Sequence, residues 1–90
     1  MKYTFVFTED ALGDLRRLEN TIARRITKKL HFWTQQSNPL SFAKPIQGTG
    51  HVTYRFRVGD YRILFEVTKD GVIKILLILA IRHRREVYRV

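Results

Sequence analysis

The sequence predicts an α+β fold in which two N-terminal helices pack on one face of a four-stranded antiparallel sheet. Residues 2–7 alternate in polarity, as strands do, and residues 8–33 carry apolar side chains at helical spacing. Three more alternating stretches follow a loop and are separated by glycine-containing turns. The predicted order is therefore β-α-α-β-β-β, and 90 residues allow one domain, residues 1–90.

The N-terminal elements begin with the aromatic strand KYTFVF. Thr8 can cap the first helix, whose opening turn holds two acids that suit the positive end of a helix dipole, and Asn20 can cap the second helix. The apolar positions of the two helices are Ala11, Leu12, Leu15 and Leu18, then Ile22, Ile26, Leu30 and Trp33. The other side of the second helix carries Arg24, Arg25, Lys28 and His31. That basic side is either a solvated surface or a contact with an acidic partner or phosphates.

The C-terminal half is expected to form a three-stranded meander. Residues 36–51 hold both prolines and two of the five glycines, so they should be mostly loop. The strands are predicted at residues 52–58, 61–68 and 72–81. A Gly-Asp turn between the first two strands places Arg57 opposite Arg62. For the second turn we expect a three-residue loop with Gly71 in the left-handed conformation, which pairs Glu66 with Lys74.

This register predicts which side chains share a face, because side chains alternate along a strand. The face under the helices would hold Val52, Tyr54, Phe56, Val58, Tyr61, Ile63, Phe65 and Val67. The open face would hold Arg55, Arg57, Arg62, Lys74, Leu76, Ile78, Ala80 and Arg82. Four arginines from three strands would then converge on the open face.

The charge balance favours a polyanionic partner. The chain has 17 Lys and Arg against 8 Asp and Glu, a net charge of +9 and a pI of about 10.5. Such a balance suits nucleic acid or an acidic protein. It suits a membrane less, because the chain has no basic amphipathic anchor with a broad apolar face. With no cysteine and no apolar stretch of about 20 residues, we expect a cytoplasmic protein.

Arginines on one face can mean ordinary solvation or phosphate binding. Antiparallel sheets commonly expose one face to water, but Glu66 is the only acid predicted on this face, whereas a solvated face would mix signs. Guanidinium groups present planar pairs of donors to phosphate oxygens. We therefore favour a phosphate-binding patch.

The closing segment AIRHRREVYRV adds further cations and Tyr88. A tyrosine can stack on a base, transfer a proton or simply anchor the chain end, and His83 is either an acid–base group or an ordinary surface histidine. The chain has no clustered carboxylates, no metal-ligand spacing of histidines and no glycine-rich phosphate loop. We therefore expect no cofactor and no metal, and any cleavage of nucleic acid should proceed without one.

The element order, the hairpin YRFRVGDYRILFEV and the ending HRREVYR resemble the RelE/ParE superfamily of toxins from bacterial and archaeal toxin–antitoxin modules. The similarity covers essentially the whole chain. It implies a RelE-type endoribonuclease, an mRNA interferase that enters the ribosomal A site and cuts the mRNA there without metal. In such enzymes the 2′-hydroxyl of the RNA attacks the adjacent phosphodiester. The resemblance also implies an acidic, RelB-like antitoxin that masks the positive surface.

The resemblance further implies roles for individual residues. Arg55 and Arg57 fall where the family places two basic residues, often lysines, before the hairpin turn. Arg62 matches the arginine that stabilises the phosphate, and Arg82 matches the basic residue implicated in protonating the leaving group. Tyr88 matches the tyrosine that orients the substrate and helps to activate the nucleophile.

Contacts to mRNA and 16S rRNA are expected from Lys44, Gln47, His83, Arg84 and Arg85. A guanidinium keeps its proton up to about pH 12, so arginine in place of lysine on the strand before the turn is a poor general base.

Two alternative functions remain open. ParE-like members of the superfamily poison DNA gyrase, and the same basic face could serve a non-catalytic RNA-binding module.

Overall fold

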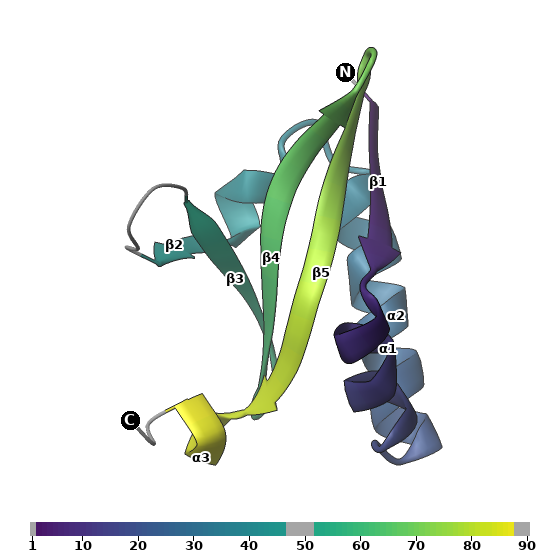
Figure 1. Cartoon of the computed structure of the whole chain (residues 1–90), viewed down its shortest axis with the longest axis vertical. Helices are drawn as coiled ribbons and strands as arrows, with labels where there is room; N and C mark the ends of the chain where they lie inside the picture. The colour runs from purple at the N-terminus through teal and green to yellow at the C-terminus, as the bar shows by residue number, and fades with distance from the viewer. Residues whose placement is uncertain (1, 47–51, 88–90) are drawn as a thin grey trace.

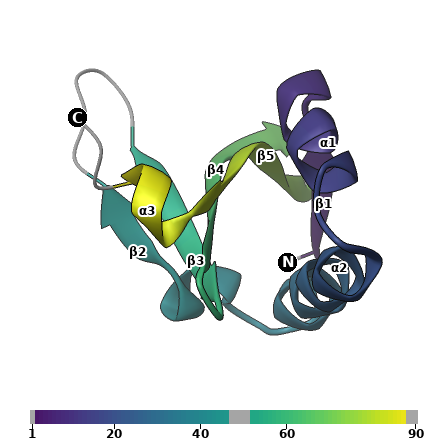
Figure 2. The ribbon, with the colours of Figure 1, turned by 90° about the horizontal axis from the view of Figure 1, so that it is seen from below.

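The computed structural model describes residues 2–46 and 52–87 of the chain. Its elements are β1 (Lys2–Phe7), α1 (Glu9–Arg16), α2 (Asn20–Thr34), the 3₁₀ helix η1 (Pro39–Phe42), β2 (Lys44–Ile46), β3 (Thr53–Val58), β4 (Tyr61–Asp70), β5 (Ile73–His83) and α3 (Arg84–Val87). The described strands form one sheet in the order β1-β5-β4-β3-β2 (Figure 1). The strongly curved sheet has α2 under its concave side and α1 beside its β1 edge, whereas α3 lies on the opposite side (Figure 2).

The predicted α+β class with two N-terminal helices is confirmed, but the sheet differs from the prediction in two respects. It has five strands rather than four, because β2 forms inside the segment predicted as loop and pairs with β3 from Lys44↔Arg55 to Ile46↔Thr53. It is also mixed rather than antiparallel, because β1 runs parallel to β5. The whole segment from α1 to β4 connects these two strands, which is longer than the crossover that a parallel pair requires.

The helices begin close to the predicted positions. Thr8 caps α1 as expected, since its Oγ1 accepts a hydrogen bond from the backbone N–H of Ala11 at 3.1 Å. The predicted cap at Asn20 is wrong by one position, because Glu19 is the N-cap of α2 and makes no side-chain capping bond. Among the described residues, no helix is long and apolar enough to cross a membrane.

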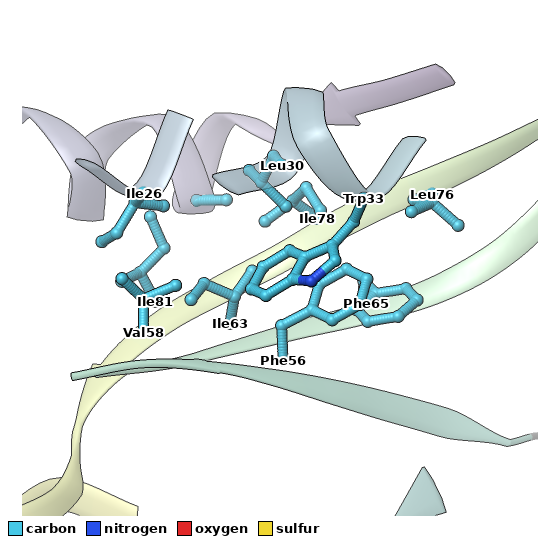
Figure 3. Packing of buried hydrophobic residues seen from close by; sticks show 11 residues of the cluster. Ile26, Leu30, Trp33, Phe56, Val58, Ile63, Phe65, Leu76, Ile78 and Ile81 are labelled. Atoms are coloured by element: carbon cyan, nitrogen blue, oxygen red, sulfur yellow. The ribbon is translucent and has the colours of Figure 1, made fainter. Parts of the chain in front are cut away.

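An aromatic stack joins α2 to the sheet (Figure 3). The ring of Trp33 lies 4.0 Å from that of Phe56, centroid to centroid, and Phe56 lies 4.4 Å from Phe65. Aliphatic side chains that are fully buried surround the stack: Ile26, Leu30, Ile63, Leu76 and Ile78. The predicted apolar faces of α2, β3 and β4 therefore meet in the core.

The first hairpin has the predicted register, with Val58 opposite Tyr61 and Arg57 opposite Arg62. Gly59 has a φ of 58°, as the first central residue of a type II′ turn requires. The second hairpin differs from the prediction. Its turn contains two residues rather than three, because Asp70 pairs with Ile73, although Gly71 is left-handed as expected, with a φ of 62°.

The register of β4 with β5 was predicted wrongly, since Glu66 pairs with Leu77 and not with Lys74. The register then shifts, because Phe65 pairs with Ile78 but Leu64 pairs with Ala80. Leu79 is thus one extra residue in β5, a β-bulge that reverses which side chains face the core beyond it.

The bulge explains which parts of the predicted open face were right. Before it, Lys74, Leu76 and Ile78 lie on the core side, contrary to the prediction, and the last two are fully buried. Beyond it, Ile81 joins the core and Arg82 lies opposite Arg62, on the face where it was expected.

The aromatic stack makes a stability prediction. Phe56→Ala should lower the free energy of unfolding by about 3–5 kcal/mol, because it removes a fully buried ring and leaves a cavity between Trp33 and Phe65. Urea unfolding followed by the fluorescence of Trp33, the sole tryptophan, measures the change. Phe42→Ala is the matched control, since its ring is 47% exposed and should cost much less. Equal losses for the two variants would contradict this description of the core.

Candidate nucleic-acid interface

The open side of the sheet carries a row of arginines across three strands. Arg57 of β3 lies opposite Arg62 of β4, and Arg62 lies opposite Arg82 of β5. Arg55 lies two residues before Arg57 and shares its face. Like charges directly opposite on paired strands destabilise a sheet. A row of arginines at these positions is therefore expected on a surface that binds a negatively charged ligand.

Three of these arginines line one small hollow, which we call the arginine hollow. It has a volume of about 110 Å³ and is lined by Phe42, Lys44, Arg55, Arg57 and Arg62. None of these lining residues is acidic, and Glu66 lies further along the same face of β4 without lining the hollow. The structure thus gathers four cations around one concave surface.

The cations of the arginine hollow differ in exposure. Arg62 is only 5% exposed, whereas Arg57 is exposed and donates a hydrogen bond from its Nε to the carbonyl of Gly59 at 3.3 Å. Lys44 is exposed and enters the hollow because β2 pairs it with Arg55. The exposed cations of the hollow can attract an anion from solution, and guanidinium groups match the geometry of phosphate oxygens.

Arg82 begins in the arginine row, but its side chain turns to α1. Its Nη1 donates to Oδ2 of Asp14 at 2.6 Å, and the same carboxylate oxygen accepts from the backbone N–H of Ile81 at 3.0 Å. This contact lies in a separate hollow of about 430 Å³, which Arg17 and Leu18 also line. The predicted convergence of four arginines therefore holds for the backbone positions and not for the guanidinium of Arg82.

The predicted substrate-binding residues His83, Arg84 and Arg85 lie together at the start of α3. With Asp60 and Glu86 they line a hollow of about 570 Å³. The backbone N–H of Arg84 donates to the carbonyl of Asp60 at 2.7 Å, and that of Arg85 donates to Nδ1 of His83 at 3.3 Å. Since Nδ1 accepts, Nε2 is the nitrogen of His83 that can donate to a ligand.

Two predicted site residues, Gln47 and Tyr88, lie outside the described residues. Within the described part of the chain, no three His, Asp or Glu side chains gather where they could hold a metal ion.

Asp14 contacts the predicted site residue Arg82, but the sequence analysis did not identify it. Its signal is its position, because Asp14 lies three residues after Ala11 and four before Leu18, on the apolar stripe of the first helix. It also lies in the last part of α1, where the helix dipole disfavours a carboxylate. An acid at such a position needs a cationic or N–H partner from elsewhere in the fold.

Comparisons with known proteins agree with this architecture. Residues 5–88 match the family described as the ParE toxin of the type II toxin-antitoxin system, parDE. The toxin RelG of Mycobacterium tuberculosis (strain ATCC 25618 / H37Rv) is 32% identical over 89 residues, which are 99% of this chain and 99% of RelG.

Solved structures share the fold. A chain of the toxin–antitoxin complex RelBE2 from Mycobacterium tuberculosis is 27% identical with a TM-score of 0.75, over 93% of this chain and 100% of that one. The archaeal RelE–RelB complex from Pyrococcus horikoshii OT3 gives 25% identity and a TM-score of 0.71 over 100% of both chains. Because the family match spans residues 5–88 and RelG is similar over almost its whole length, this chain belongs to the RelE/ParE family of toxins of type II toxin–antitoxin systems.

Proposed function

We propose that this toxin is a ribosome-dependent endoribonuclease that cuts mRNA in the ribosomal A site. The arginine hollow carries the proposal, because it places Lys44, Arg55, Arg57 and Arg62 around one concave surface, with no acid among the described residues that line it. A phosphodiester gains negative charge as it is attacked, and cations already in place stabilise that charge without reorganising. Arginine also matches the geometry of phosphate oxygens.

In the proposed reaction the 2′-oxygen of the RNA attacks the adjacent phosphorus, and the bond from phosphorus to the 5′-oxygen breaks. The products are a 2′,3′-cyclic phosphate and a 5′-hydroxyl end. The 2′-hydroxyl therefore gives up a proton and the leaving oxygen takes one up. Because the RNA supplies the nucleophile and guanidinium groups supply the positive charge, this reaction needs no metal ion.

We assign the chemical roles as follows. Arg62 stabilises the phosphate and Arg82 supplies the proton that the leaving 5′-oxygen takes up. Tyr88 orients the substrate and takes part in activating the 2′-hydroxyl. Arg55 and Arg57 hold the RNA backbone, since a guanidinium is a poor base at neutral pH. Contacts to mRNA and 16S rRNA come from Lys44, Gln47, His83, Arg84 and Arg85, and the ribosomal substrate places the protein in the cytoplasm.

A second candidate function is inhibition of DNA gyrase, which is favoured by the ParE description of the matching family. This function needs no cleavage of nucleic acid, so the arginine row would take part in binding and not in catalysis. We favour the endoribonuclease because the chain holds arginines at positions 62 and 82 and a tyrosine at position 88, the set that the family's ribonucleases use.

The proposed partner is an acidic antitoxin. The net charge of +9 would attract one, and the relatives from Mycobacterium tuberculosis and Pyrococcus horikoshii were crystallised as toxin–antitoxin complexes. Masking of the arginine hollow by such a partner would block access of RNA phosphates. The antitoxin would then inhibit the toxin by covering the same surface that binds RNA.

In-vitro translation of a defined mRNA with the protein added should produce cuts at the A-site codon. Free mRNA should stay intact, because the ribosome presents the message in the reactive geometry. Cutting should persist in EDTA at concentrations that leave ribosomes intact, and primer extension maps the ends. An intact message together with inhibited supercoiling by gyrase would support the ParE-like alternative, and ribosome binding without cutting would support the non-catalytic RNA-binding module.

Arg62→Ala should lower the single-turnover rate of cleavage on ribosomes by about 100- to 1,000-fold, the usual cost of losing one donor to a developing negative charge. Tyr88→Phe should also abolish most of the activity. Lys69→Ala is the matched control, since it removes one positive charge from β4 at an exposed position outside the arginine hollow. Equal rates for Arg62→Ala and Lys69→Ala, with both proteins folded, would refute the assigned role of Arg62.

The association rate with the acidic antitoxin should be high at low salt and fall steeply as salt is added. The reason is that the Debye length shrinks from about 10 Å at 0.1 M to about 3 Å at 1 M ionic strength, which removes electrostatic steering. Stopped-flow mixing at several salt concentrations measures this rate, with the dissociation rate as an internal comparison that should change less. An association rate independent of salt would count against charge-driven capture.

A further inference from the structure

The edge of β5 continues beyond its partner strand. β1 pairs with β5 only as far as Phe7↔Ile78, and residues 79–83 of β5 extend past that point. The connection into α1 takes over there, because the backbone N–H of Thr8 donates to the carbonyl of Ile78 at 3.0 Å and its Oγ1 donates to that of Leu79 at 3.4 Å. Backbone groups at a sheet edge need such partners.

Asp14 supplies the next partner along the same edge. Its Oδ2 accepts from the backbone N–H of Ile81 at 3.0 Å and from Nη1 of Arg82 at 2.6 Å, while Oδ1 accepts from Nη2 of Arg17 at 3.2 Å. The side chain of Asp14 is only 14% exposed, against 40% for Arg82 and 72% for Arg17. The bond to exposed Arg17 is therefore weak, and the partly shielded bond to Arg82 is the stronger one.

Within residues 2–46 and 52–87, the guanidinium of Arg82 is held through one nitrogen. Nη1 donates to Asp14 and also to the carbonyl of Ile81 at 3.3 Å. Among the described residues, no acceptor lies within hydrogen-bond distance of its Nε or Nη2. These two nitrogens form one edge of the guanidinium, and that edge can give two parallel hydrogen bonds to a phosphate.

We propose that Asp14 is a positioning residue for Arg82. By holding Nη1 against the edge of β5, Asp14 fixes the guanidinium just outside the arginine hollow and leaves its Nε–Nη2 edge available to the leaving oxygen of the RNA. The link to the backbone N–H of Ile81 ties this orientation to the sheet itself, one residue before Arg82 and beside the arginine row. This inference rests on the proposed endoribonuclease function.

Holding the guanidinium in place should act on the rate and not on binding. A flexible arginine side chain loses rotational freedom when it engages a substrate, and Asp14 has already removed part of that freedom. A ribosome-bound message is recognised by many cations, of which Arg82 is one. The expected signature is therefore a lower maximal rate with an almost unchanged half-saturating concentration of ribosomes.

The test uses Asp14→Asn in the full-length protein, alone and combined with Arg82→Ala. An asparagine oxygen still accepts from the N–H of Ile81, but it lacks the negative charge that holds Arg82. We expect Asp14→Asn to lower the maximal single-turnover rate on ribosomes by about 10-fold. In the Arg82→Ala background the same change should alter the rate by less than about twofold, because Asp14 acts through Arg82.

Two control variants separate this role from general effects. Asp10→Asn removes an exposed acid from the same helix, and Arg17→Ala removes the other partner of Asp14. Both should cut at close to the unaltered rate. Thermal unfolding followed by Trp33 checks that each variant is folded, and if Asp14→Asn does not fold, Asp14→Glu, which keeps the charge but displaces it, replaces it in the same cycle.

The outcomes are distinct. Equal losses in the two backgrounds would make Asp14 merely structural, and faster cutting by Asp14→Asn would mean that Asp14 restrains Arg82; either result overturns the inference. An unaltered rate in Asp14→Asn overturns it as well but leaves the proposed function standing. An unsubstituted protein that does not cut mRNA on ribosomes overturns the proposed function, and this inference with it.

Discussion

The β-bulge at Leu79 lets one strand serve both the core and the arginine row. Before the bulge, β5 directs Leu76 and Ile78 into the core, and beyond it Ile81 does the same one residue out of phase. Without an extra residue, a strict alternation that buried Ile78 would also direct Arg82 toward the core. Burying a charge there would be costly. The bulge therefore makes the hydrophobic packing compatible with a cation opposite Arg62.

At the same end of the sheet, some basic side chains lie next to a carboxylate and others do not. Arg82 meets Asp14, and Arg84 lies 3.9 Å from a carboxylate oxygen of Asp60. In the part of the chain that the structure describes, no acid lines the arginine hollow. Cations with a nearby carboxylate are oriented by it, whereas several cations around one hollow make it positive and favour an incoming anion. Arg82 and Arg84 are therefore oriented by carboxylates, whereas the cations of the arginine hollow are suited to binding a phosphate.

The short strand β2 shows why local sequence did not define the site completely. Pro45 cannot donate a ladder hydrogen bond and tends to lie in edge strands, which is the position of β2. Nothing in the local pattern KPI reveals which strand it joins, because pairing depends on where β3 lies in space. The pairing nevertheless decides that Lys44 lies opposite Arg55 and enters the arginine hollow.

The sequence alone determined the class of the fold, the capping of α1 by Thr8, the register of the first hairpin and the common face of Arg55, Arg57 and Arg62. These features depend on residues close together in the chain, where helical spacing, alternation and turn type act directly. Tertiary structure decided the parallel pairing of β1 with β5, the bulge at Leu79 and the contact of Asp14 with Arg82, which joins residues 68 positions apart. Such features follow from packing between distant segments. No local pattern encodes where a strand takes an extra residue, or which distant group a carboxylate on a helix will contact.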